Sequence, residues 1–200
     1  MTFTTAMRCF LRSDPDVIMV GEVRDRQTLE LCFQAALTGH LVMTTLQTDD
    51  APGAIRRMID IGVEAFLIEQ SVILISAQRL VRLLCPACSV ATELTGDEDI
   101  HLRKLATAGG LDWDKQPRKF RKPVGCPKCS KQGYRGRTIV AEMMEMSGPL
   151  RTAIRTGAPV EELQTVAVAG GMTTMVADGL RRAANGQTTV DEVLRVMALR

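Results

Sequence analysis

Apolar residues near the start of the chain follow two different spacings. Short continuous runs, VIMV at 17–20 and LVMTTL at 41–46, are typical of buried strands. Between them, the segment 25–37 repeats its apolar residues at helical intervals and is followed by Gly39, a residue type that commonly ends helices. A strand, a helix and a second strand in this order predict a βαβ unit, and hence an α/β fold with a parallel sheet.

The same rules predict mostly helices in the rest of the chain. The segment 50–61 places an aspartate and a proline where an N-cap and a first helical turn need them. The strongly apolar segment 64–78 is predicted to be helical, and 137–146 to be a strand. Thr189 and Glu192 would form a capping box for the last helix. Further helices are expected at 1–12, 148–155, 159–169, 173–185 and 190–199.

Charge and composition argue against several classes of protein. The 25 basic and 23 acidic residues leave a net charge of +2, and aromatic residues make up only 4% of the chain. A nucleic-acid-binding protein is disfavoured, because it needs cations for phosphates and aromatic rings for base stacking. No apolar run approaches the roughly 18–20 residues of a spanning helix, and the N-terminus lacks the order of a secretory signal. We therefore expect a cytoplasmic protein without a membrane span of its own.

Four of the six cysteines have the spacing of metal ligands. They form two C-x-x-C pairs, Cys85 with Cys88 and Cys126 with Cys129. Two such pairs can supply the four thiolates of a closed, structural zinc site, with redox-active or core pairs as the alternative. The zinc would clamp the ends of a polar insertion, whose basic stretch at 115–122 is interpreted as a solvated face. Cys9 and Cys32 are expected in the core.

Polar side chains follow both strands of the βαβ unit. Glu22 comes just after the first strand, and Gln47 follows the second. The carboxyl ends of parallel strands meet at one edge of a sheet, where ligands bind, so these two side chains should lie on the same edge. Such an acid can act on the magnesium ion or the water of a nucleotide site, although a strand that simply meets solvent gives the same pattern. His40 precedes its strand and is expected elsewhere, with a structural role as the alternative to a chemical one.

The segment GYRGR at 133–137 follows the second cysteine pair and has two interpretations. Its arginines, on a turn flanked by glycines, could bind a phosphate or a carboxylate. Alternatively, the segment is a tight turn with a packed tyrosine, and the sequence does not favour one over the other.

Five segments, in order, carry a resemblance to a known family. They are DPDVIMVGEVRD, ALTGHLVMTTL, AQRLVRLLCPAC, CPKCSKQGYRGR and TTVDEVLRV. Together they resemble the secretion and pilus-assembly ATPases, the motors of type II secretion and type IV pilus extension, over essentially the whole chain. The resemblance implies a RecA-like phosphate-loop domain that works as a hexamer with ATP and Mg²⁺, and a tetracysteine insertion that binds Zn²⁺.

The resemblance also implies roles for individual residues. Glu22 would be the acid of an atypical Walker B motif, acting with magnesium, and Arg24 and Asp25 would complete its signature. His40 would belong to the histidine box near the nucleotide. Gln47 stands where the family usually has a second histidine, and an amide can hydrogen-bond but cannot titrate near neutral pH. The zinc ligands would be Cys85, Cys88, Cys126 and Cys129.

By this resemblance the chain divides into three parts. Residues 1–84 would form a partial RecA-like ATPase core, 85–136 the zinc-binding insertion, and 137–200 a strand with a helical C-terminal subdomain. The sequence contains no G-x-x-x-x-G-K-[ST] phosphate loop. The chain is therefore expected to be truncated at its N-terminus, complete at its C-terminus, and unable to hydrolyse ATP alone.

Three functions compete at this point. The first is the C-terminal part of a hexameric motor ATPase, held at the inner membrane by platform proteins of a secretion or pilus machine. The second is a non-enzymatic remnant or regulator that docks on intact motor subunits, an alternative strengthened by Gln47. The third is a zinc-ribbon nucleic-acid binder that uses 115–122, and the balanced charge weighs against it.

Overall fold

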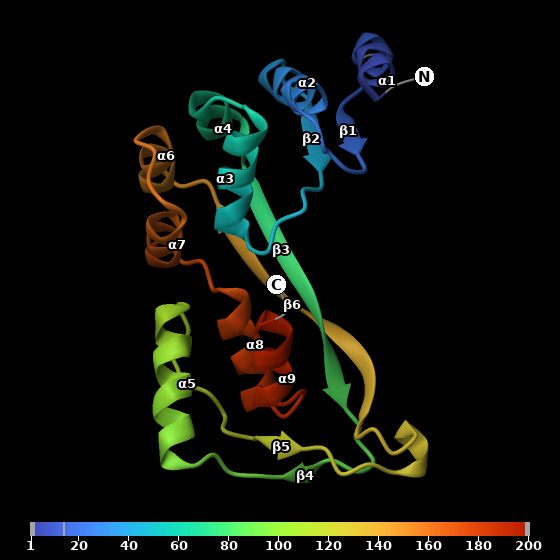
Figure 1. The fold of residues 1–200 in the computed structure, drawn as a ribbon, viewed down its shortest axis with the longest axis vertical. Coiled ribbons are helices and arrows are strands. Elements are labelled where there is room, and N and C mark those ends of the chain that lie inside the picture. The colour runs from blue at the N-terminus through green and yellow to red at the C-terminus, as the bar shows by residue number, and fades with distance from the viewer. Residues whose placement is uncertain (1–2, 14, 199–200) are drawn as a thin grey trace. The chain divides into compact units, whose positions relative to one another are not determined.

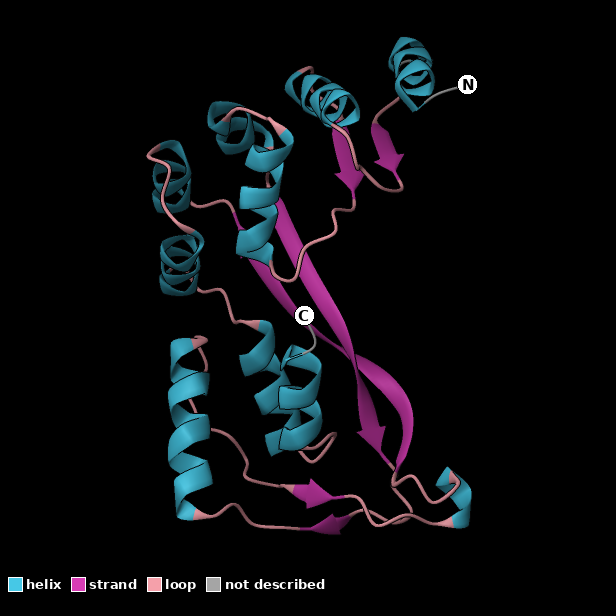
Figure 2. Ribbon diagram, in the orientation of Figure 1, coloured by secondary structure: helices cyan, strands magenta, loops and turns pink. Residues whose placement is uncertain are grey.

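The computed structural model describes residues 3–13 and 15–198 (Figure 1). The chain forms two compact units. The first contains residues 1–75 and 144–167, and the second contains 76–143 and 168–200. Helices and strands both occur, as the α/β prediction requires (Figure 2). Within the described ranges, none of the helices combines the length and the apolar character that crossing a bilayer requires.

The first unit begins with the predicted βαβ arrangement. Its elements are α1 (Phe3–Phe10), the 3₁₀ helix η1 (Leu11–Ser13), β1 (Val17–Val20), α2 (Arg26–Leu37) and β2 (Leu41–Thr44). The strands β1 and β2 pair in parallel, with Val17 opposite Leu41 and Val20 opposite Thr44, which confirms the prediction. The α2 helix ends just before Gly39, whose φ of 99° lies in the left-handed region that favours glycine. Positions 1 and 2 of the first predicted helix lie outside the described residues.

Among the described residues, the prediction that both strands are buried is confirmed only for one face of β1. Ile18 and Val20 are buried, whereas Met19 is 74% exposed. Leu41 and Met43 on β2 are also exposed. Continuous apolar runs indicate burial on both faces, but in this structure one face of β1 is covered, and on β2 only Val42 is even half-buried.

The first unit contains further helices, and all except the one predicted at 64–78 follow the predicted boundaries closely. They are α3 (Ala51–Ile61), α4 (Ala65–Ser71), α6 (Gly148–Arg155) and most of α7 (Val160–Ala169). The side chain of Asp50 accepts a hydrogen bond from the Gly53 amide at 2.7 Å, so it is the N-cap that the sequence predicts. The α4 helix packs against α2, α3 and α6.

The helix predicted at 64–78 is wrong in its second half. It ends at Ser71, and Leu74–Leu84 instead forms β3, which pairs with β6 (Tyr134–Glu145). The Met146 amide donates to the Ile73 carbonyl at 3.0 Å, and the Cys85 amide donates to the Gly133 carbonyl at 2.9 Å, so the strands run antiparallel. Pairing with a strand distant in sequence overrides a local apolar pattern that fits either element.

The second unit combines small strands with three helices. Its elements besides β3 and β6 are β4 (Val90–Ala91), α5 (Gly96–Ala108), β5 (Arg121–Lys122), the 3₁₀ helix η2 (Pro127–Cys129), α8 (Met175–Ala184) and α9 (Val190–Ala198). The sequence analysis did not predict α5, which lies inside the polar insertion. A capping box starts this helix, because Thr95 accepts from the Glu98 amide and the Glu98 carboxylate accepts from the Thr95 amide.

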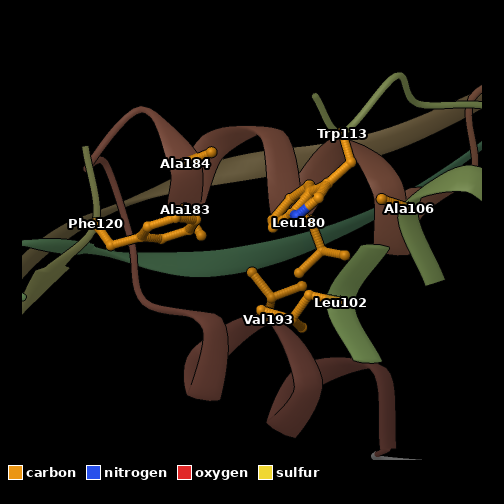
Figure 3. Packing of buried hydrophobic residues seen from close by; sticks show 8 residues of the cluster. All are labelled: Leu102, Ala106, Trp113, Phe120, Leu180, Ala183, Ala184 and Val193. Carbon is orange, nitrogen blue, oxygen red and sulfur yellow. The ribbon is translucent and has the colours of Figure 1, made fainter. Parts of the chain in front are cut away.

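The insertion contributes to the hydrophobic core of the second unit. Figure 3 shows side chains from α5 and the loop after it packed against side chains of α8 and α9. These residues are Leu102, Ala106, Trp113, Phe120, Leu180, Ala183, Ala184 and Val193. The Trp113 indole is 1% exposed and donates to Asp99 Oδ1 at 2.8 Å. The insertion is therefore part of the folded core and not a separate surface loop.

A buried acid ties α9 to β3. The Glu192 side chain is completely buried and accepts hydrogen bonds from the Arg82 guanidinium at 2.6 Å and from the Arg82 amide at 3.1 Å. Arg195 donates to the same carboxylate at 2.8 and 2.9 Å. The Thr189 hydroxyl accepts from the Glu192 amide at 3.0 Å, which confirms the capping side of the predicted box, whereas the Glu192 carboxylate lies on the two arginines.

Replacement of Gly179 by alanine tests how closely α8 and α9 approach. A Cβ atom at this position would lie 2.5 Å from Cγ1 of Val193, a buried β-branched residue that cannot move away easily. We expect Gly179→Ala to lower the free energy of unfolding by about 1–2 kcal/mol, because overpacking outweighs the gain in helix propensity. Chemical denaturation would measure it. The control Gly148→Ala adds a methyl group to open space and should be neutral or slightly stabilising, so equal stability of both variants would contradict close packing.

Candidate functional sites

The segments that follow β1 and β2 are linked to each other at the carboxyl edge of the strand pair. The Val23 amide donates to the Thr45 carbonyl at 3.1 Å, and the Thr45 hydroxyl donates to the Gly21 carbonyl at 2.7 Å. These bonds continue the contact between the two segments beyond the last paired residues of β1 and β2. Thr45 was not singled out in the sequence, although a hydroxyl just after a strand end is a signal for such a link.

Both oxygens of the Glu22 carboxylate have partners from this chain. Oε1 accepts a hydrogen bond from Gln47 Nε2 at 2.6 Å, and Oε2 lies 2.7 Å from the Arg24 guanidinium. The hydrogen bond from Arg24, with a smaller contribution from Gln47, holds the pKa of Glu22 below its ordinary value. The Glu22 side chain is 29% exposed and that of Arg24 is 75% exposed, so the acid is accessible from solvent. The structure thus brings together Glu22, Arg24 and Gln47.

Asp25 has a structural position at the start of α2. Its carboxylate accepts from the Thr28 amide at 2.9 Å and from the Thr28 hydroxyl at 2.8 Å. These bonds, chiefly the one from the amide, lower the pKa of Asp25. The residue therefore caps the helix and fixes where the segment after Glu22 turns into α2.

His40 lies away from this edge. It directly precedes Leu41, the first residue of β2, which pairs with the first residue of β1. Because the strands are parallel, His40 is at the amino end of the pair, whereas Glu22 and Gln47 are at the carboxyl end. Its Nδ1 lies 3.0 Å from the Ala35 carbonyl and 3.0 Å from the Thr38 hydroxyl, so the ring is tied to the end of α2.

The four cysteines of the two pairs form a cluster in the second unit. Their sulfur atoms all lie within 4.8 Å of one another. The separations are 3.9 Å between Cys85 and Cys126, and 3.8 Å from Cys129 to both Cys88 and Cys126. Four thiolates at about 2.3 Å from a tetrahedral zinc ion stand about 3.8 Å apart, so these three separations match a Cys₄ zinc site.

Backbone amides point at these sulfur atoms, as they do where thiolates bind metal. The Cys126 and Gly133 amides each donate to Cys129 Sγ at 3.2 Å, and the Gly125 amide donates to Cys88 Sγ at 3.3 Å. The bonds to Cys129, led by the one from Cys126, lower the pKa of that thiol to about 6. Loss of solvation raises the pKa of Cys88 to about 11. A bound zinc ion would favour the thiolate at both positions.

A glycine permits the second cysteine pair to fold this tightly. Gly125 has a φ of +102°, and a Cβ there would lie 2.6 Å from the Lys131 carbonyl oxygen. Only glycine accommodates both the left-handed conformation and this close approach. The polypeptide can therefore turn back on itself between β5 and the second cysteine pair.

The GYRGR segment begins strand β6 and is not a tight turn, but its tyrosine is packed as the second interpretation expects. The Tyr134 hydroxyl lies 2.9 Å from the Thr189 hydroxyl, and the Arg82 guanidinium stacks 4.1 Å from the centre of the Tyr134 ring.

The two cysteines outside the cluster differ in burial. Cys32 is buried as expected, whereas Cys9 is exposed, so its predicted place in the core is wrong.

The basic stretch at 115–122 is only partly a solvated face. Lys115 pairs with Asp112 at 2.8 Å, and Arg118 pairs with Asp99 and stacks on the Trp113 ring. Several of its cations are thus engaged by the protein itself, which leaves less charge for nucleic-acid phosphates.

Comparisons with known proteins identify relatives over nearly the whole sequence. The family described as "Type II/IV secretion system protein" matches residues 1–195. The chain is 43% identical over 196 residues to the type II secretion system protein HxcR of Pseudomonas aeruginosa, with 98% of this chain and 36% of HxcR covered. It is 42% identical over 194 residues to the type IV pilus assembly ATPase PilB of Myxococcus xanthus, with 97% of this chain and 33% of PilB covered. The chain thus spans about a third of the length of the curated relatives it matches.

Solved structures give the same picture for the fold. The crystal structure of the pilus retraction motor PilT with bound ADP superposes with a TM-score of 0.66 at 25% identity, covering 98% of this chain and 43% of PilT. The ATPase DotB of Legionella pneumophila superposes with a TM-score of 0.65 at 21% identity, covering 98% of this chain and 42% of DotB. These likenesses support the α/β fold of a secretion ATPase.

Proposed function

The chain belongs to the family of type II/IV secretion system proteins, and on this premise we propose that it supplies one part of the nucleotide site and the zinc-binding insertion of a motor ATPase. The observation that carries the proposal is the acid at the carboxyl edge of the parallel strands. Glu22 is accessible there and is held by Gln47 and Arg24. Ligands of α/β sheets bind at this edge.

In this proposal Glu22 is the acid that acts with Mg²⁺ and water during ATP hydrolysis. Arg24 is its neighbouring cation, and Asp25 fixes the turn into α2. The phosphate loop that would position the nucleotide comes from residues other than these 200. His40 acts away from the Glu22 edge, and its role near a nucleotide is proposed for a partner subunit's site, since it lies at the other end of β2.

The four clustered cysteines are proposed to hold one structural Zn²⁺. A set of four thiolates leaves no coordination position for a substrate, so the metal stabilises the fold and takes no part in hydrolysis. We retain the division into a partial RecA-like core (1–84), a zinc-binding insertion (85–136) and a strand with a helical subdomain (137–200) as part of the proposal.

The proposed setting is a hexamer on the cytoplasmic side of the inner membrane. Subunit rearrangement during ATP hydrolysis would act on platform proteins of a type II secretion or type IV pilus machine. The relatives support this setting, since they include a type II secretion protein and a type IV pilus assembly ATPase.

The purified 200-residue chain should not turn over ATP. Phosphoryl transfer depends on positioning and electrostatic stabilisation, and this sequence has no phosphate loop to provide them. A phosphate-release assay with Mg²⁺ would measure it, with Glu22→Ala and the exposed control Glu30→Gln compared in parallel. Turnover that Glu22→Ala abolishes and Glu30→Gln leaves intact would contradict this expectation.

The mass of the native product in its source cells separates the motor from the second candidate, a regulator that docks on intact subunits. Gln47, in place of a titratable histidine, is the feature that favours the regulator. A mass near 21.9 kDa together with co-purification of a complete motor subunit would support the regulator. A product of about twice that mass or more would support the motor, and Glu22→Gln in that product should lower ATP turnover at least about 100-fold.

A further inference from the structure

We propose that Gln47 is a positioning residue for Glu22, holding one carboxylate oxygen through a neutral donor while the other oxygen faces Arg24. The catalytic meaning of this contact rests on the proposed function of Glu22. The contact itself is a property of this chain and can be tested without a nucleotide.

The two side chains come from the segments that follow β1 and β2. Gln47 Nε2 donates to Glu22 Oε1 at 2.6 Å, across 25 positions of sequence. The backbones beneath them are joined by the Val23–Thr45 and Thr45–Gly21 hydrogen bonds. Because these bonds fix the spacing of the two segments, the Gln47 amide arrives at a set distance from the carboxylate. These three hydrogen bonds join the two segments at this edge, and the one from Gln47 holds the Glu22 carboxylate.

Gln47 and Arg24 differ in what they can contribute. Arg24 comes from the same segment as Glu22, two residues further on, and its side chain is 75% exposed. A surface ion pair of this kind is weak and is screened by salt. Gln47 comes from the segment after β2, so its bond restricts the direction in which the carboxylate points. Its amide also keeps the same charge at every physiological pH, which imidazole does not.

The orientation of the Gln47 amide follows from its partner. A carboxylate only accepts hydrogen bonds, so the nitrogen of the amide must face Glu22. The carbonyl oxygen of Gln47 is then directed away from Glu22 and remains available as an acceptor. Gln47 can therefore hold the acid and at the same time accept a hydrogen bond from a water molecule beside it.

Solution NMR on the ¹⁵N- and ¹³C-labelled 200-residue chain tests the proposal from both partners. The side-chain amide signal of Gln47 should be shifted downfield, with exchange against water slowed by about fivefold, as one net hydrogen bond implies. Both effects should disappear in Glu22→Ala. In Gln47→Ala, the three-bond couplings of Glu22 should change from those of one dominant rotamer to averaged values.

Three further variants sharpen the result. Gln34→Ala removes an exposed glutamine from α2 and should leave Glu22 unchanged. Gln47→His retains a ring N–H donor and should restore the ordered Glu22 rotamer, whereas Gln47→Glu replaces the donor by a like charge and should not. Gln47 signals that are insensitive to Glu22→Ala, or Glu22 couplings that are insensitive to Gln47→Ala, would overturn the proposal.

The experiment separates this inference from the proposed function. No nucleotide is present, so a missing contact would leave the role of Glu22 as the acid intact. Conversely, a confirmed contact in a chain whose native product shows no Glu22-dependent ATP hydrolysis would overturn the proposed function while retaining the pairing of Gln47 with Glu22.

Discussion

Removal of zinc from the metal-loaded chain should unfold the second unit and expose Trp113. The four cysteine sulfurs hold together the two ends of the segment 89–125. That segment carries α5, Trp113 and Phe120, which form the core with α8 and α9. Without the metal, no bond holds the two ends of this segment together, so packing interactions alone must offset the chain entropy that is lost when the ends meet. Loss of the site should therefore affect α8 and α9, although both lie far from the cysteines in sequence.

The expected effect is large compared with the stability of a domain. Zinc binding by small Cys-rich sites contributes an apparent free energy of about 10–16 kcal/mol at neutral pH, whereas whole domains are stable by about 5–15 kcal/mol. The four clustered cysteines and Trp113 all lie in the second unit, so the first unit should retain its helices. A partial loss of helical signal with a complete change at Trp113 is the expected signature.

The measurement uses the only tryptophan of the chain as the reporter. Chelation of the zinc, or Cys129→Ser, should shift the Trp113 emission to the red, and circular dichroism should show that part of the helix content is lost. Cys9→Ser is the matched control, because that thiol is exposed and lies outside the cluster. One equivalent of zinc per chain is expected before chelation. A chain that purifies with stoichiometric zinc and keeps a buried Trp113 after its removal would show that the core folds without the metal.

The two candidate sites differ in how much of them could be predicted from sequence. The cysteine cluster follows from the spacing of two C-x-x-C pairs, because each pair forms a local turn that presents two sulfurs. The edge with Glu22 and Gln47 follows from the βαβ pattern, because parallel strands end at one edge. The hydrogen bond between Glu22 and Gln47 does not follow, since it depends on side-chain rotamers and on the Thr45 link between the strands.

The errors in the fold prediction have physical causes. The segment 64–78 is apolar in a way that suits a helix or a strand, and the partner that selects β3 lies about 60 residues away in β6. The composition of the insertion indicates a polar connection, because α5 contains many charged residues. Only a few of its residues, among them Leu102 and Ala106, face the core, and Trp113 joins them from the following loop. Long-range packing of this kind leaves little trace in local periodicity.

Replacement of Glu192 by alanine should lower the free energy of unfolding by about 3 kcal/mol. The completely buried carboxylate receives three hydrogen bonds from Arg82 and Arg195 side chains and one from the Arg82 amide. Breaking a buried ion pair costs about 3–5 kcal/mol, and the lower end applies because both guanidinium groups reach solvent and can be hydrated there. Chemical denaturation of the zinc-loaded chain measures the loss. Arg135→Ala, which removes an exposed arginine from β6, should change stability by less than about 0.5 kcal/mol.

The same network predicts the direction of a pH dependence. Burial opposes ionisation of Glu192, but Arg195 and Arg82 outweigh it and lower its pKa to about 2. In the unfolded chain a glutamate has a pKa of about 4.3, so the unfolded state takes up the proton first as the pH falls. The contribution of Glu192 is therefore complete above about pH 4.3 and is lost as the pH falls from there towards 2. Glu192→Gln should be less stable than the native chain at pH 7, and the difference should shrink on acidification. A difference that stays constant between pH 7 and pH 3 would mean that Glu192 contributes through packing and not through its charge.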